Sequence, residues 1–102
     1  MTEYVPDKWV VIEITTPDYT IRKVLASYWG SYLDSDSWRV SSGITKVVPV
    51  KDHYIFHNES GSTYECFKYR QGMSAYTASV FESWVRELPT GTTMTIVEDY
   101  NE

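Results

Sequence analysis

The sequence predicts an α+β fold, a single domain over residues 1–102 in which an antiparallel β-meander is covered on one face by one main helix at about 74–88. Three observations predict it. The 102 residues are the length of one ordinary domain, enough to bury one core. Hydrophobic residues make up 42% of the chain and aromatic residues 16%, which argues against disorder. Short alternating or β-branched runs recur along the chain, which predicts a sheet of about five to seven strands, and one segment has helical periodicity.

The first strand is predicted at residues 9–15. Residues 1–7 precede it as a polar lead-in containing Pro6, and we expect them to be flexible, as we do the acidic tail at 99–102. Val10, Ile12 and Ile14 share one face of the strand. The opposite face carries Trp9 and Val11, so the strand is apolar on both sides and is expected inside the sheet.

Residues 16–30 fit either a helix or a strand. As a helix, the segment would have Thr16 as its N-cap and Pro17 in its first turn. As a strand, it would run from about 20 to 29 and return through a wide loop at 31–37. The loop favours the strand, and the helix is kept as the alternative interpretation.

Four strands are predicted between residues 38 and 69, at 38–42, 44–50, 54–58 and 62–69. Short connections rich in Gly, Asn, Asp and Ser separate them, which predicts the antiparallel meander. Pro49 lacks a backbone donor and is expected near a bulge or on an edge strand. The Ser-Gly segments at 42–46 and 60–64 resemble each other, although a match this short also arises by chance.

The helix is predicted to begin at Ser74 and to end before Pro89 and Gly91. Its apolar stripe consists of Val80, Phe81, Trp84, Val85 and Leu88. Such a stripe is typical of a helix that packs on a sheet, and a last strand follows at 92–98.

The net charge is −5, which argues against direct binding of nucleic acid. Residues 37–72 nevertheless carry five basic and three acidic side chains, so a mildly cationic centre is expected on an acidic body. One cysteine cannot form an intramolecular disulfide, and the chain shows neither a secretory signal pattern nor an apolar run of the roughly 20 residues that span a bilayer. We expect a cytoplasmic protein that does not enter the membrane.

Candidate catalytic and metal-binding groups are few. Cys66 beside His53 or His57 is the one thiol–imidazole combination, and a buried, unreactive Cys66 is the favoured interpretation. Two histidines and one cysteine are too few for a typical zinc site, and the 34–36 loop lacks the glycine and the glutamate of an EF-hand. We therefore expect no enzyme, no cofactor and no metal.

Aromatic residues gather around the 31–37 loop. The candidate binding site consists of Tyr28, Trp29, Tyr32, Trp38, Arg39 and Lys46. Tyrosine and tryptophan bury a large rigid area and keep a polar group, which suits recognition. Arg39 could hold a carboxylate or phosphate. The alternative is that two or three of the aromatic residues pack under the helix.

Two stretches carry a family resemblance, at 28–47 and 57–76. The matching residues are Ser37, Trp38, Arg39, Ser41, Ser42, Gly43 and Ile44, then Ser60, Gly61, Ser62, Tyr64 and Cys66, then Gly72, Met73, Ser74 and Tyr76. On these residues the chain resembles small uncharacterised proteins encoded by tailed phages of marine bacteria, cyanophages in particular. Ser27 and Ser31 depart from the small or glycine residues expected there. The resemblance covers about half of the chain and implies an origin without an activity.

The leading hypothesis is a non-enzymatic phage accessory protein that binds a host protein in the cytoplasm of the infected cell. An acidic body favours a basic partner. The alternative is a protein that binds or sequesters a small ligand or nucleotide through Arg39, Lys46 and the aromatic residues. Monomer and homodimer both remain open, because an exposed edge at 44–50 or at the last strand could pair with a second chain, whereas Pro49 and the flanking lysines protect against such pairing.

Overall fold

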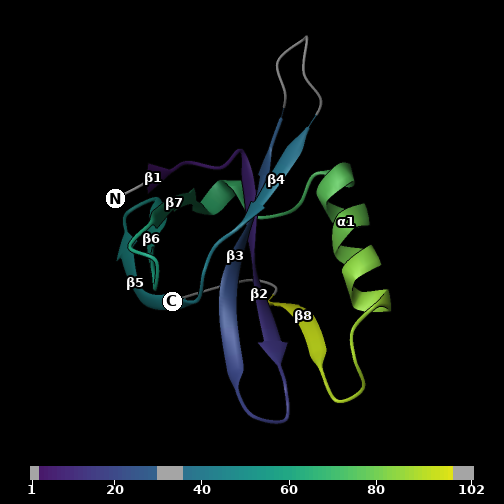
Figure 1. Cartoon of the computed structure of the whole chain (residues 1–102). Coiled ribbons are helices and arrows are strands. Elements are labelled where there is room, and N and C mark those ends of the chain that lie inside the picture. Colours follow the sequence, from purple (N-terminus) through teal and green to yellow (C-terminus); the bar gives the residue numbers. More distant parts are fainter. Residues whose placement is uncertain (1–2, 30–35, 98–102) are drawn as a thin grey trace.

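The computed structural model describes residues 3–29 and 36–97, which form three layers (Figure 1). One sheet has the strand order β1-β7-β6-β5, a second has the order β4-β3-β2-β8, and helix α1 covers the outer face of the second. The elements are β1 (Glu3–Tyr4), β2 (Lys8–Thr15), β3 (Thr20–Tyr28), β4 (Ser37–Val40), β5 (Ile44–Val50), β6 (His53–Asn58), β7 (Thr63–Phe67), the 3₁₀ helix η1 (Lys68–Arg70), α1 (Ala75–Arg86) and β8 (Thr93–Val97). Over the described residues the chain is one α+β domain, as predicted, with eight strands.

The prediction of a single meander sheet is wrong, because the chain changes sheets between β4 and β5. Strand β4 pairs with β3, whereas β5 pairs with β6. At the crossing, the N–H of Ser41 donates to the carbonyl of Val24 in the second sheet, at 2.9 Å. Two residues later, the carbonyl of Gly43 accepts from the N–H of Glu59 in the first sheet, also at 2.9 Å. Ser42 and Gly43 thus carry the chain from one sheet to the other instead of closing a hairpin.

The first sheet is mixed. Its β5–β6 and β6–β7 pairs are antiparallel, as the short connections predict, but β1 pairs with β7 in parallel through Glu3 with Thr63 and Tyr4 with Tyr64. Flexibility was predicted for residues 1–7; within that segment, residues 3–4 form β1, and Pro6 is fully buried. The tail at 99–102 lies outside the described residues.

Strand β2 holds the three layers together, because its two faces are buried against different partners. Trp9 and Val11 face the first sheet, where they meet a core that includes Phe56 and Cys66. The indole N–H of Trp9 also donates to the carbonyl of Phe67, at 2.7 Å. This two-sided burial explains the near-continuous apolar sequence, and the prediction of an interior strand is confirmed, with β3 and β8 on either side.

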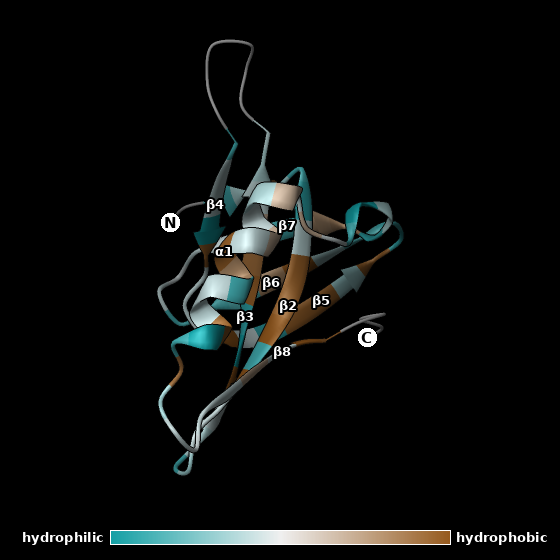
Figure 2. Cartoon of the chain, turned by 90° about the vertical axis from the view of Figure 1, so that its right-hand side faces the viewer, coloured by the Kyte–Doolittle hydropathy of each residue, from teal (hydrophilic) through white to brown (hydrophobic). Residues whose placement is uncertain are grey.

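The other face of β2 lies under α1 (Figure 2). Val10 and Ile12 pack there with Leu25 and Phe81, and Trp84 lies at the margin of this cluster. The helix runs within the predicted range. Its N-cap is Ser74, whose hydroxyl accepts from the N–H of a residue in the first turn, and it ends at Arg86. No helix in the part of the chain that the structure describes is long and apolar enough to cross a bilayer.

The ambiguous segment at 16–30 is a strand. Strand β3 (Thr20–Tyr28) pairs along its length with β2 and at its end with β4. Both faces of the strand are buried over Val24–Ser27, which explains why apolar residues occur on both faces there. Pro49 lies in β5, an edge strand, as predicted.

Candidate functional site

The aromatic residues of the predicted site separate onto two faces of the second sheet. Trp38 lies on the helix side, where its ring meets that of Trp84 edge to face at a centroid distance of 4.8 Å, and 38% of it remains exposed. Tyr28 lies on the opposite side, partly buried against the core between the sheets. Trp29 follows it and is 54% exposed. Tyr32 lies outside the described residues.

Arg39 lies on the same face as Tyr28 and reaches the first sheet. Its guanidinium lies over the ring of Tyr4, 4.6 Å from the centroid. That ring stacks in turn on Tyr64 of β7, with centroids 4.7 Å apart and planes at 28°. Among the described residues no carboxylate forms an ion pair with Arg39. The guanidinium is therefore held by a tyrosine stack while its N–H groups keep their capacity to bind an anion.

A cleft of about 310 Å³ adjoins this arginine, between β4 and the β1–β7 edge of the first sheet. We call it the serine cleft; its lining residues are Tyr4, Arg39, Val40, Ser41, Ser42, Ser60, Ser62 and Tyr64. Lys46 does not line it. This lysine is exposed on β5, where it pairs with His57, so the structure does not bring it to Arg39.

Three serine hydroxyls of the cleft form a hydrogen-bonded chain. Ser42 Oγ donates to Ser60 Oγ at 3.1 Å and accepts from the N–H of Ser60 at 3.0 Å. Ser60 Oγ lies 3.0 Å from Ser62 Oγ, and either atom could donate. The side-chain amide of Asn58 donates to Ser62 Oγ at 3.3 Å. Two of the three hydroxyl protons are used within this chain, so whichever way the last bond runs, Ser60 or Ser62 keeps one proton for a ligand.

Ser41 has a structural role at the edge of the cleft. Its hydroxyl accepts from the buried N–H of Val24 at 2.8 Å and donates to the carbonyl of Ser42 at 2.7 Å. Both capacities are satisfied within the protein, so this hydroxyl fixes the crossing between the sheets and leaves ligand contacts to the other serines.

Two tyrosines near Arg39, Tyr28 and Tyr64, are neutral at physiological pH. Burial raises the pKa of Tyr28 to about 12 and also raises the pKa of Tyr64, and the positive charge of Arg39 offsets only part of this effect. The phenol oxygen of Tyr28 is buried without a hydrogen-bond partner among the described residues. The described residues that line the serine cleft include no carboxylate, so the charge of Arg39 is not neutralised within this cleft.

A second cleft of about 510 Å³ lies on the other side of the Tyr4–Arg39 pair. We call it the aromatic cleft; it is lined by Glu3, Tyr4, Val5, Tyr28, Ser37, Trp38 and Arg39. The two clefts share Tyr4 and Arg39 as a common wall.

A further hollow of about 680 Å³ lies between β3 and β5 and has a different chemistry. Ile21, Ile44 and Val47 give it an apolar lining. Its arginine, Arg22, is already paired with Glu13 at 2.9 Å. This hollow therefore does not offer the available cation that distinguishes the serine cleft.

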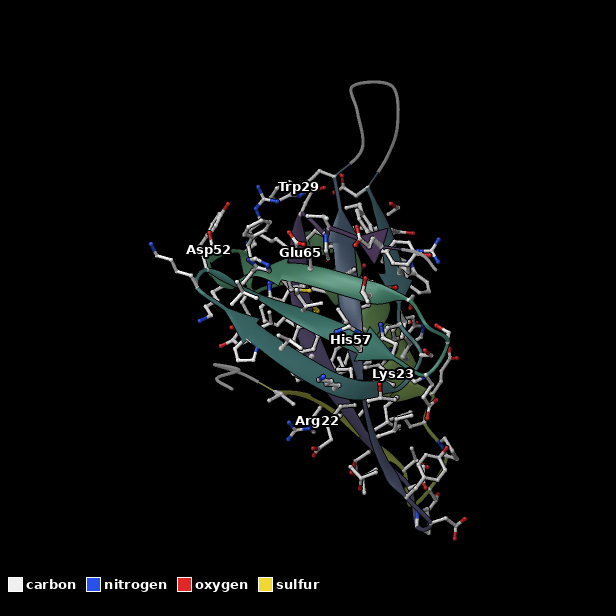
Figure 3. The ribbon with its side chains drawn as sticks, turned by 90° about the vertical axis from the view of Figure 1, so that its left-hand side faces the viewer. Arg22, Lys23, Trp29, Asp52, His57 and Glu65 are labelled. Atoms are coloured by element: carbon white, nitrogen blue, oxygen red, sulfur yellow. The ribbon has the colours of Figure 1, made fainter. Side chains whose placement is uncertain are left out.

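The thiol and the imidazoles do not face each other. Cys66 is fully buried between the sheets, where burial raises the pKa of its thiol well above the usual value. His53 and His57 alternate with the buried residues of β6, and Figure 3 shows His57 on the outer face of the same sheet. His53 instead meets Asp52, with Nδ1 and Oδ1 2.8 Å apart. Over residues 3–29 and 36–97, no three metal-ligating side chains form a cluster that could hold a metal ion.

Sequence reasoning identified Arg39 but missed Tyr4, Ser60, Ser62 and Tyr64. The signal for the serines was the pair of similar Ser-Gly segments, which the structure brings into hydrogen-bonding contact. Tyr4 gave no signal, because it lies in a short polar segment that precedes the first predicted strand.

Comparison of the chain with models of protein families, with curated proteins and with solved structures finds no match.

Proposed function

We propose that the protein is a non-enzymatic binding protein that holds a small anionic ligand in the serine cleft. The observation that supports this proposal is the position of Arg39, which is stacked on Tyr4, faces serine hydroxyls and has no carboxylate partner among the described residues. A guanidinium and a free hydroxyl proton are both hydrogen-bond donors, so the cleft is complementary to an acceptor-rich anion.

The stack on Tyr4 favours binding, because a guanidinium already fixed by neighbouring rings loses less side-chain entropy when a ligand arrives. Hydrogen bonds to a charged group contribute about 1.5–3 kcal/mol each. Removing the guanidinium should therefore weaken binding at least tenfold.

The overall charge of −5 limits the size of the ligand. One arginine can hold one anionic group, whereas a long polyanion would be repelled by the rest of the surface. Lys46, which the sequence analysis placed in the same site, is not available to extend it. We therefore propose a small ligand and no direct binding of nucleic acid.

Equilibrium dialysis with radiolabelled inorganic phosphate at low ionic strength tests the proposal. Wild type should bind at one saturable site, Arg39→Gln should lose at least tenfold in affinity, and Arg39→Lys should fall between them. Lys46→Gln is the matched control, because it removes an exposed positive charge outside the cleft. Equal losses in Arg39→Gln and Lys46→Gln would show a general charge effect and refute the proposal.

A second candidate function is the binding of a host protein by a phage accessory protein. It is favoured by apolar side chains at the end of β3, where Trp29 is 54% exposed and Val5 is 50% exposed. The N–H of Trp29 donates to a carboxylate oxygen of Asp7 at 2.9 Å, which fixes the backbone that carries the ring. Capture from host lysate at low salt should yield a partner that Trp29→Ser loses and Tyr19→Ser, at another exposed aromatic position, retains. Recovery of the same proteins by all three baits would contradict it.

A further inference from the structure

We propose that the ligand is a mononucleotide, with its phosphate in the serine cleft and its base in the aromatic cleft. This inference rests on the proposed function and adds the identity of the ligand class. The geometric support is the common wall: Tyr4 and Arg39 line both clefts, so a ligand that reaches from one to the other passes the guanidinium. Volumes of about 310 and 510 Å³ both fall within the range of about 300–1,000 Å³ that is typical of ligand pockets.

The serine cleft suits a phosphate monoester better than a carboxylate. A phosphate presents three acceptor oxygens and carries close to two negative charges at neutral pH. Arg39 can donate two parallel hydrogen bonds to two of these oxygens, and the spare proton on Ser60 or Ser62 can reach the third. A carboxylate has only two oxygens and would leave part of this donor set without an acceptor.

The aromatic cleft suits a flat, partly polar ring. Val5 and Tyr28 give it apolar and aromatic surface, and Glu3 and Ser37 add polar groups that can bond the edge of a base; the ring of Trp38 packs on Trp84 on the other face of the sheet. The carboxylate of Glu3 also disfavours a second anionic group in this cleft. Because the two clefts share one guanidinium, additional phosphates would lack a cation, and a monophosphate should bind more tightly than the triphosphate.

Calorimetric titration with inorganic phosphate, ribose 5-phosphate, adenosine and adenosine 5′-monophosphate tests this assignment. The monophosphate should bind at least tenfold more tightly than ribose 5-phosphate and adenosine, because it alone fills both clefts. Val5→Trp places a bulky side chain at a half-exposed position in the aromatic cleft. This variant should reduce the affinity for the monophosphate to that for ribose 5-phosphate and leave the affinity for inorganic phosphate unchanged.

The possible outcomes separate this inference from the proposed function. Phosphate and ribose 5-phosphate could bind in a way that Arg39→Gln abolishes, while the monophosphate binds no more tightly than ribose 5-phosphate. That result refutes the mononucleotide as the ligand and retains the anion site. If adenosine binds as tightly as its monophosphate, the assignment of the phosphate is refuted. If none of the four ligands binds to wild type, both proposals fail.

Discussion

Replacing Ser41 by alanine should lower the free energy of unfolding by about 2 kcal/mol. The substitution removes the hydroxyl that accepts from the N–H of Val24 where the chain leaves the second sheet. Ser41 is 4% exposed, and its hydroxyl is the acceptor for the N–H of Val24, which is fully buried. The carbonyl of Val24 accepts from the N–H of Ser41, so both polar groups of Val24 point towards β4. Without the hydroxyl, the N–H has no acceptor on that side.

The magnitude follows from the cost of leaving a buried donor unpaired, about 1–3 kcal/mol. The second lost bond adds less, because it goes to the carbonyl of Ser42, a partly exposed residue that water can reach. For a domain of this size, about 2 kcal/mol corresponds to a fall in Tm of roughly 10 °C.

Urea unfolding followed by tryptophan fluorescence measures this effect. The matched control is Ser42→Ala, one residue along the same crossing. Among the described residues the hydroxyl of Ser42 bonds only to Ser60, at the surface, so its loss should cost less than about 1 kcal/mol. A Ser41→Ala protein within about 0.5 kcal/mol of wild type, or equal losses in both variants, would refute the role assigned to the buried N–H.

Three further predictions concern buried titratable groups and the cap of α1. Burial raises the pKa of Cys66 above 9.0 and the pKa values of Tyr28 and Tyr64 above 10.0, so the folded state keeps protons that the unfolded chain releases. Stability should therefore be complete below about pH 9 and should fall as the pH rises towards 12, and a urea midpoint equal at pH 8 and pH 10.5 would contradict this. The thiol of Cys66 should react with a thiol reagent at neutral pH only at the rate of unfolding, and rapid labelling without denaturant would show an open route to it. Ser74→Ala removes the N-cap of α1 and should cost about 1 kcal/mol in urea unfolding, whereas a change below about 0.3 kcal/mol would exclude a capping role.

The elements that the sequence predicted correctly are those whose signals are local. Strand β2 shows its two buried faces as a continuous apolar run, and α1 shows its cap at Ser74 and its stripe at helical spacing. The pairing of sheets is not local. A Ser-Gly pair such as Ser42-Gly43 has the same composition whether it closes a hairpin or carries the chain to another sheet. The backbone bonds that fix the crossing join Ser41 to Val24 and Gly43 to Glu59, each pair 16 or more positions apart.

The candidate site shows the same limit. Arg39 could be identified because an arginine beside aromatic residues is conspicuous in the sequence. Its partners could not, since Tyr4 reaches it through the parallel β1–β7 pair, which joins residues 60 positions apart. The two Ser-Gly segments were visible as similar stretches, but only the crossing between the sheets and the β6–β7 turn bring Ser42 to Ser60.

A nitrogen-15 NMR titration of the full chain with inorganic phosphate at low ionic strength shows directly whether the serine cleft binds an anion. We expect saturable shifts of the Arg39 side-chain N–H and of the backbone amides of Ser42, Ser60 and Ser62, all with one dissociation constant, and their loss in Arg39→Gln. Shifts that fail to saturate, or that gather at Lys46 and the other surface lysines, would contradict an anion site at the serine cleft.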